Sequence, residues 1–76
     1  MTEPAGNDTS LSSLTSREAE VLAGTSRGGT NAQIACELGI TVHAVKFHLG
    51  SIFRKLEVRN RTEAATVYIR TIGDRS

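Results

Sequence analysis

A phenylalanine interrupts the amphipathic pattern of the segment ITVHAVKFHLGSIFRKL, residues 40–56. At about 3.6 residues per turn, one face of a helix over this segment is apolar and consists of Val42, Val45, Leu49, Ile52, Phe53 and Leu56. Phe47 falls on the opposite face, with Lys46 beside it and with His43, Gly50, Ser51 and Arg54 around it. Hydrogen-bond donors, positive charge and an apolar ring on one face suit a ligand that offers acceptors, negative charge and apolar groups.

The net charge of +1 is distributed unevenly along the chain. Residues 1–40 hold two arginines against five carboxylates, which gives −3, whereas residues 41–61 hold five cations against Glu57 alone, which gives +4. Residues 62–76 balance to zero. A basic segment of this kind is typical of a polyanion-binding site, and a solvated helix face followed by a basic loop is the alternative.

Length and composition exclude several classes of protein. The 76 residues make one domain, and a single cysteine allows no internal disulfide. The sequence has no Cys/His cluster with metal-ligand spacing and no nucleophile–base pair, so we expect no metal, no cofactor and no enzymatic activity. The first ten residues do not resemble a signal peptide, and no apolar run approaches the roughly 20 residues of a membrane span. We therefore expect a cytoplasmic protein without a membrane partner.

Composition divides the chain into a tail and a folded domain. Residues 1–13 are rich in Gly, Ser, Thr, Asn and Asp, and they are predicted to be a disordered tail or a linker. Residues 14–73 are predicted to fold as four helices, and no alternating strand pattern is present. The predicted fold class is therefore all-α, a four-helix bundle.

Capping residues mark the ends of the four predicted helices. The pairs Thr15 with Glu18 and Asn60 with Glu63 have the spacing of capping boxes, which would begin the first and fourth helices. The other predicted boundaries are the N-caps Thr30 and Thr41 and the helix stops Gly39 and Gly73.

The second and third predicted helices have the spacing of a helix-turn-helix. Counted from Asn31 as the first position, the fourth, fifth, eighth, ninth, tenth and fifteenth positions hold Ile34, Ala35, Leu38, Gly39, Ile40 and Val45. The fifth position must be small because the helices cross closely there, and the ninth needs glycine because the chain turns tightly. Any short pair of helices joined at a glycine is the alternative.

On these residues the chain resembles the LuxR-type, or GerE-like, DNA-binding domain of bacterial transcription regulators. The stretches that carry the resemblance are LTSREAEVLA (14–23), GGTNAQIACELGIT (28–41), VKFHLGSIFRKL (45–56) and VRNRTEAA (58–65). The resemblance implies a four-helix bundle whose third helix is the recognition helix for double-stranded DNA. It also implies dimerisation through the fourth helix.

Base contacts are expected from the third helix. The resemblance assigns Lys46 and Phe47 to the groove, where an ammonium group can donate to guanine and a phenyl ring can contact a thymine methyl. His43 and Ser51 lie on the same face and are expected to contact bases too. The alternative for Phe47 is packing against a second subunit or the tail. His48 is expected to be a half-buried, hydrogen-bonded structural residue.

Phosphate contacts are expected at two places. Thr30 and Asn31 match family positions that meet a phosphate at the start of the second helix, where free N–H groups and the helix dipole favour an anion. N-capping is the alternative role for Thr30. The cations of the basic segment that suit phosphate contacts are Arg54, Lys55, Arg59 and Arg61. Arg61 has the alternative of pairing with Glu18 or Glu57 within the fold.

The chain departs from the family pattern at three places. Ala44 replaces a common threonine, so one hydroxyl near the phosphates or the helix start is lost. Gly50 replaces a residue that is often polar or basic, which weakens base contacts and lowers the stability of the helix. Gly24 and Ser26 stand where the family continues with apolar residues. We therefore expect the first helix to be short or frayed.

The fourth helix has more apolar surface than one core-facing side requires. Its second side, formed by Ala65, Ile69 and Ile72, is expected to be a two-fold homodimer interface, with a single broad core stripe as the alternative. The predicted function is sequence-specific binding of double-stranded DNA by a dimeric bacterial transcription regulator. The alternative is a helix-turn-helix module for protein interaction or dimerisation that contacts RNA polymerase or another regulator.

Overall fold

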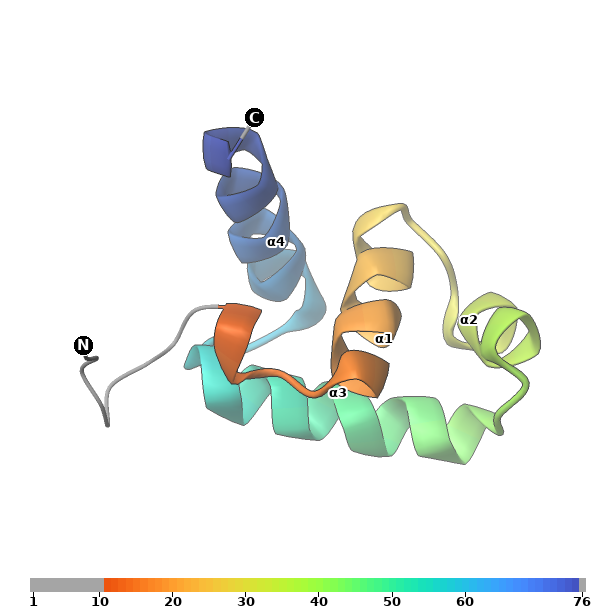
Figure 1. Ribbon diagram of the computed structural model, residues 1–76. Coiled ribbons are helices and arrows are strands. Elements are labelled where there is room, and N and C mark those ends of the chain that lie inside the picture. The colour runs from red at the N-terminus through yellow and green to blue at the C-terminus, as the bar shows by residue number, and fades with distance from the viewer. Residues whose placement is uncertain (1–10, 76) are drawn as a thin grey trace.

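The computed structural model describes residues 11–75 as a succession of helices (Figure 1). A short 3-10 helix and four α-helices follow one another as η1 (Leu11–Ser13), α1 (Ser16–Ser26), α2 (Asn31–Leu38), α3 (Val42–Leu56) and α4 (Arg61–Arg75). Residues 11–75 include no strand, so the all-α prediction is confirmed. Within this described part of the chain, no helix has the length and apolar character of a membrane span.

Side-chain caps begin the first three α-helices at the predicted residues. Thr15 and Glu18 make both bonds of a capping box, with distances of 3.1 Å and 2.9 Å. Thr41 Oγ1 accepts from the Ala44 N–H at 3.0 Å. At the end of α2, Gly39 adopts the left-handed conformation with φ +70°, which makes the tight turn into α3. The local signals for the helix-turn-helix are confirmed.

The start of α4 differs in one detail from the predicted capping box. The Glu63 N–H donates to Asn60 Oδ1 at 2.9 Å, as expected for an N-cap. The Glu63 carboxylate, however, accepts from the Arg59 N–H at 2.7 Å instead of from the Asn60 N–H.

Both ends of the folded domain extend beyond the predicted boundaries. Residues 11–13, which were assigned to the tail, form η1, because Leu11 packs against the core. Residues 1–10 of the predicted tail lie outside the described residues. At the other end, α4 passes through Gly73 and ends at Arg75. A glycine inside a helix costs only about 1 kcal/mol relative to alanine, so it does not by itself end the helix.

The prediction of a short or frayed first helix is wrong, and the reason is a close helix contact. α1 continues through Gly24 to Ser26. A Cβ atom on Gly24 would lie 2.9 Å from Cγ1 of Ile34, closer than such atoms approach. Glycine therefore permits α2 to pack directly on the last turns of α1.

The core lies on one side of α3, where α1, α2 and α4 pack against it (Figure 1). Its buried apolar residues are Val21, Leu22, Ile34, Ala35, Val45, Leu49, Ile52, Leu56 and Ala64. Val42 is an exception to the predicted apolar face, because it is the first residue of α3 and is 39% exposed.

Candidate nucleic-acid interface

The side of α3 that faces away from the bundle is uncovered in the described part of the chain. Figure 1 shows α1, α2 and α4 together on the opposite side of α3. We call the outward side of α3 the uncovered face; it consists of His43, Lys46, Phe47, Gly50, Ser51 and Arg54. Phe47 is 68% exposed, so the prediction that its ring lies in solvent is confirmed.

The ring of Phe47 is supported from one side by His48. The two ring centroids are 5.9 Å apart, and the rings meet edge to face at 69°. His48 is half-buried, as predicted, but its ring makes this aromatic contact and no hydrogen bond with a described residue. Because His48 is half-buried, its edge-to-face contact limits the orientations of the exposed phenyl ring.

Two cations, one on the uncovered face and one in the loop before α4, are available to a ligand. The ammonium group of Lys46 and the guanidinium of Arg59 make no hydrogen bond or ion pair with other described residues. Both residues line a shallow hollow of about 420 Å³, together with Gly50 and the partly buried Phe53. The sequence does not predict this hollow, because it forms where the loop before α4 passes α3.

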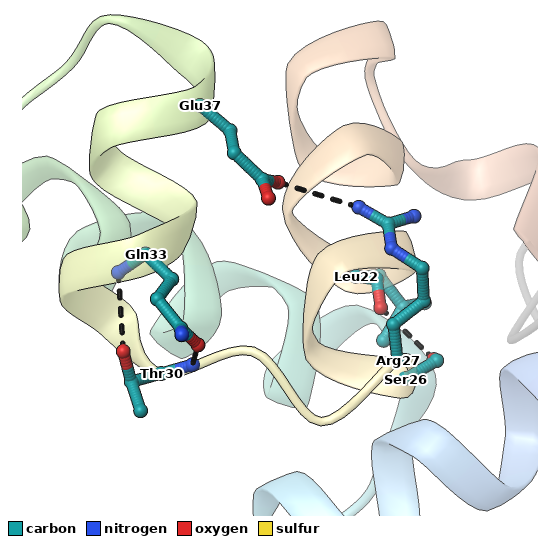
Figure 2. Close-up of polar contacts among 6 residues, drawn as sticks. All are labelled: Leu22, Ser26, Arg27, Thr30, Gln33 and Glu37. Carbon is teal, nitrogen blue, oxygen red and sulfur yellow. Dashed lines mark hydrogen bonds and ion pairs between the residues drawn. The ribbon is translucent and has the colours of Figure 1, made fainter.

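A second polar site surrounds the N-terminus of α2. Thr30 and Gln33 form a reciprocal capping box, drawn in Figure 2, with distances of 2.8 Å and 3.1 Å. The backbone N–H groups of Asn31 and Ala32, the first two residues of α2, have no acceptor within their own helix. They are therefore open to an anion, and Thr30 acts as an N-cap in addition to any ligand contact.

Arg61 joins this second site to the start of α4. Its guanidinium donates to Asn31 Oδ1 at 2.9 Å and to the Gly29 carbonyl at 3.0 Å. Pairing with Glu18 or Glu57, the alternative from sequence, is therefore not what the structure shows. Since arginine only donates, Asn31 must turn its oxygen toward Arg61, which leaves its amide N–H₂ group for a ligand.

The hollow at this second site has a volume of about 460 Å³ and contains one buried hydroxyl without a partner. Its lining consists of Thr25, Gly28, Gly29, Thr30, Asn31 and Arg61. Thr25 Oγ1 makes no hydrogen bond within the described part of the chain. Beside this hollow, an exposed ion pair of 3.4 Å between Arg27 and Glu37 connects the end of α1 to α2, as Figure 2 shows.

Lys55, predicted as a phosphate contact, is an internal ion-pair partner in the structure. Its Nζ lies 2.8 Å from Oε1 of Glu18, whose side chain is buried. Burial raises the pKa of the Glu18 carboxyl group. The hydrogen bonds from Lys55 and the Thr15 N–H, together with the positive charge of Lys55, lower this pKa by more. The pKa of Glu18 therefore lies below its usual value. The pair therefore ties the end of α3 to the start of α1.

The structure thus separates the predicted site residues into groups. The uncovered face contains His43, Lys46, Phe47, Ser51 and Arg54. The second site contains Thr30, Asn31 and Arg61. On α4, Ala65 is half-buried, while Ile69 and Ile72 are 58% and 45% exposed. Among the side chains that the structure describes, no group of three or more His, Cys, Asp and Glu residues is placed to hold a metal ion.

A helix-turn-helix whose second helix exposes a cationic and aromatic face defines a class of protein, the helix-turn-helix nucleic-acid-binding domains. Comparison with known families agrees with that class. The family described as "Bacterial regulatory proteins, luxR family" matches residues 12–68. The chain belongs to this family, and the resemblance seen in the sequence is confirmed.

Individual relatives carry names of the same kind. The chain is 44% identical over 63 residues to "Probable transcriptional regulatory protein SgaR" of Hyphomicrobium methylovorum, covering 83% of this chain and 30% of that protein. It is 49% identical over 53 residues to "Transcriptional regulatory protein LiaR" of Bacillus subtilis (strain 168), covering 70% and 25%. It is 40% identical over 63 residues to "Nitrate/nitrite response regulator protein NarP" of Escherichia coli (strain K12), covering 83% and 29%. The chain therefore spans less than a third of the length of these relatives.

Proposed function

We propose that this chain binds double-stranded DNA in a sequence-specific manner, with α3 in the major groove, as part of a bacterial transcription regulator. The observation that carries the proposal is Phe47, 68% exposed on the outward side of the recognition helix, with the unpaired ammonium of Lys46 next to it. Water is a poor environment for a phenyl ring, whereas thymine methyl groups and base edges in a major groove can cover it.

The second site supports the same proposal because it would hold the DNA backbone. The open N–H groups of Asn31 and Ala32 lie at the positive end of α2 and favour a phosphate. Arg61 lies beside them and adds positive charge to the same hollow. A phosphate held there would fix the position of α3 in the groove without contributing sequence preference.

The experiment is selection of binders from a random duplex library by the purified chain at moderate salt. An enriched motif supports the proposal, and Phe47→Ala is then expected to reduce discrimination among sequences more than it reduces non-specific affinity. Equal losses on both measures would contradict base contact by Phe47. Binding without enrichment that falls steeply with salt would mean that phosphate contacts dominate. No binding at low salt would favour the alternative, a module that contacts RNA polymerase or another regulator.

We also propose that the DNA-bound form is a homodimer that pairs through α4. The support is the exposed apolar surface of Ile69 and Ile72, with the half-buried Ala65 on the same helix. A two-fold dimer would select two half-sites about one turn, roughly 10 base pairs, apart. Ile69→Asp is expected to abolish the dimer in sedimentation experiments, and an unchanged mass distribution would exclude this surface.

A further inference from the structure

The middle of the uncovered face has a gap where Gly50 replaces a side chain. Phe47 precedes Gly50 by three residues and Arg54 follows it by four, so all three lie on one stripe of α3. A Cβ atom on Gly50 would have one neighbour within 4 Å outside the local backbone, Nη1 of Arg54 at 3.8 Å. Within 4 Å, the space above Gly50 therefore holds only the guanidinium of Arg54. Gly50 also lines the hollow beside Lys46 and Arg59.

Ser51 holds Arg54 in this position. Nη2 of Arg54 donates to Ser51 Oγ at 3.2 Å, and Arg54 makes no ion pair with any described carboxylate. The side chain thus folds back one turn toward the N-terminus of α3, which is the direction in which helical side chains lean. One hydrogen bond to a hydroxyl uses one of the five guanidinium donors, so the others remain for a ligand.

On the basis of the proposed DNA binding, we propose that Arg54 contacts a base through the gap at Gly50 and that Ser51 is a positioning residue. The sequence alone favoured a phosphate contact for Arg54. The placement favours a base, because Arg54 lies on the central stripe of the uncovered face with Phe47. The planar guanidinium fork matches the O6 and N7 acceptors of guanine.

The position of that guanine relative to the Phe47 contact follows from helix geometry. The guanidinium lies over Gly50, about one turn or 5 Å along α3 from Phe47. Base pairs repeat about every 3.4 Å, so the guanine is expected one to two base pairs from the pair that Phe47 contacts.

The test is library selection with the wild-type chain, Arg54→Gln, Gly50→Leu and the matched control Arg59→Gln. Arg54→Gln is expected to remove one guanine from the motif and to lower discrimination at that base pair by about ten- to a hundredfold. Gly50→Leu fills the gap and is expected to remove the same guanine. Arg59→Gln, which lies outside the stripe, is expected to weaken binding to all sequences alike.

The outcomes separate this inference from the proposed function. If the wild-type chain selects a motif but Arg54→Gln weakens binding to all sequences as Arg59→Gln does, Arg54 is a phosphate contact and only this inference fails. If the wild-type chain selects no motif, the proposed function fails and this inference fails with it. Melting curves for each variant exclude unfolding as the cause, since Arg54 is exposed and Leu is a better helix former than Gly.

Discussion

Two pairs of cations in the basic segment have opposite surroundings. Lys55 and Arg61 are bonded to other parts of the fold, to Glu18 in one case and to Asn31 and Gly29 in the other. Lys46 and Arg59 make no side-chain bond with the described residues. The net charge of residues 41–61 therefore overstates the charge that is free to bind a polyanion, because Glu18 neutralises Lys55. Arg61 keeps its charge at the second site, since both of its partners are neutral.

The largest expected effect in this comparison is the loss of the Arg61 side chain. Arg61→Met removes two charge-assisted hydrogen bonds that connect the start of α4 to Gly29 and to Asn31, the first residue of α2. The free energy of unfolding is expected to fall by about 2 kcal/mol, measured by urea denaturation. Arg61→Lys is the matched control. It keeps the positive charge, but lysine cannot donate to both acceptors in the geometry of a guanidinium, so only part of the lost unfolding free energy should be recovered. If Arg61→Met changed the free energy of unfolding by less than about 0.5 kcal/mol, the two hydrogen bonds of Arg61 would not stabilise the fold.

Removal of Lys55 is expected to cost somewhat less, because its side chain is 37% exposed. Lys55→Met leaves the buried carboxylate of Glu18 with only the hydrogen bond from the Thr15 N–H. The free energy of unfolding is expected to fall by about 1 to 2 kcal/mol, between the values for surface and buried pairs. The double variant Lys55→Met, Glu18→Gln should recover part of this loss, since no buried charge remains. If the double variant lost as much unfolding free energy as the two single variants together, Lys55 and Glu18 would not interact directly.

The same pair predicts a dependence of stability on pH. The pKa of Glu18 in the folded chain lies below its ordinary value of 4.5, so the charged carboxylate stabilises the fold above that pH. This stabilisation is lost as the pH falls from about 4.5 through the lowered pKa. The difference in unfolding free energy between wild type and Lys55→Met should therefore shrink below pH 4.5, as measured by urea denaturation at several pH values. A difference that stays constant down to pH 2 would contradict the predicted linkage.

Features that depend on residues close together in the sequence were predictable, whereas contacts between residues far apart in the sequence were not. The Thr15 and Thr41 caps and the turn at Gly39 depend on residues within one helical turn, and the sequence predicts all three. The bond from Arg61 to Asn31 joins residues 30 apart, and that from Lys55 to Glu18 joins residues 37 apart. Such partners follow from helix packing, which local pattern does not specify. The exposure of Phe47 was predictable because helical periodicity alone assigns it to the outward face.

The smallest expected effect on stability, and the clearest on binding, comes from the free cations. Lys46→Met and Arg59→Met break no bond of the fold, so each should change the free energy of unfolding by less than about 0.5 kcal/mol. If each cation contacts one phosphate, each variant should lower the slope of log affinity against log salt by about 0.9. Lys46 differs from Arg59 because it also lies on the uncovered face, which the proposed binding mode turns toward the bases. Lys46→Met should therefore change the selected motif as well, whereas Arg59→Met should weaken all duplexes alike. Identical effects of the two substitutions would mean that Lys46 contacts only the backbone, and Phe47 and Arg54 would then be left as the main base contacts.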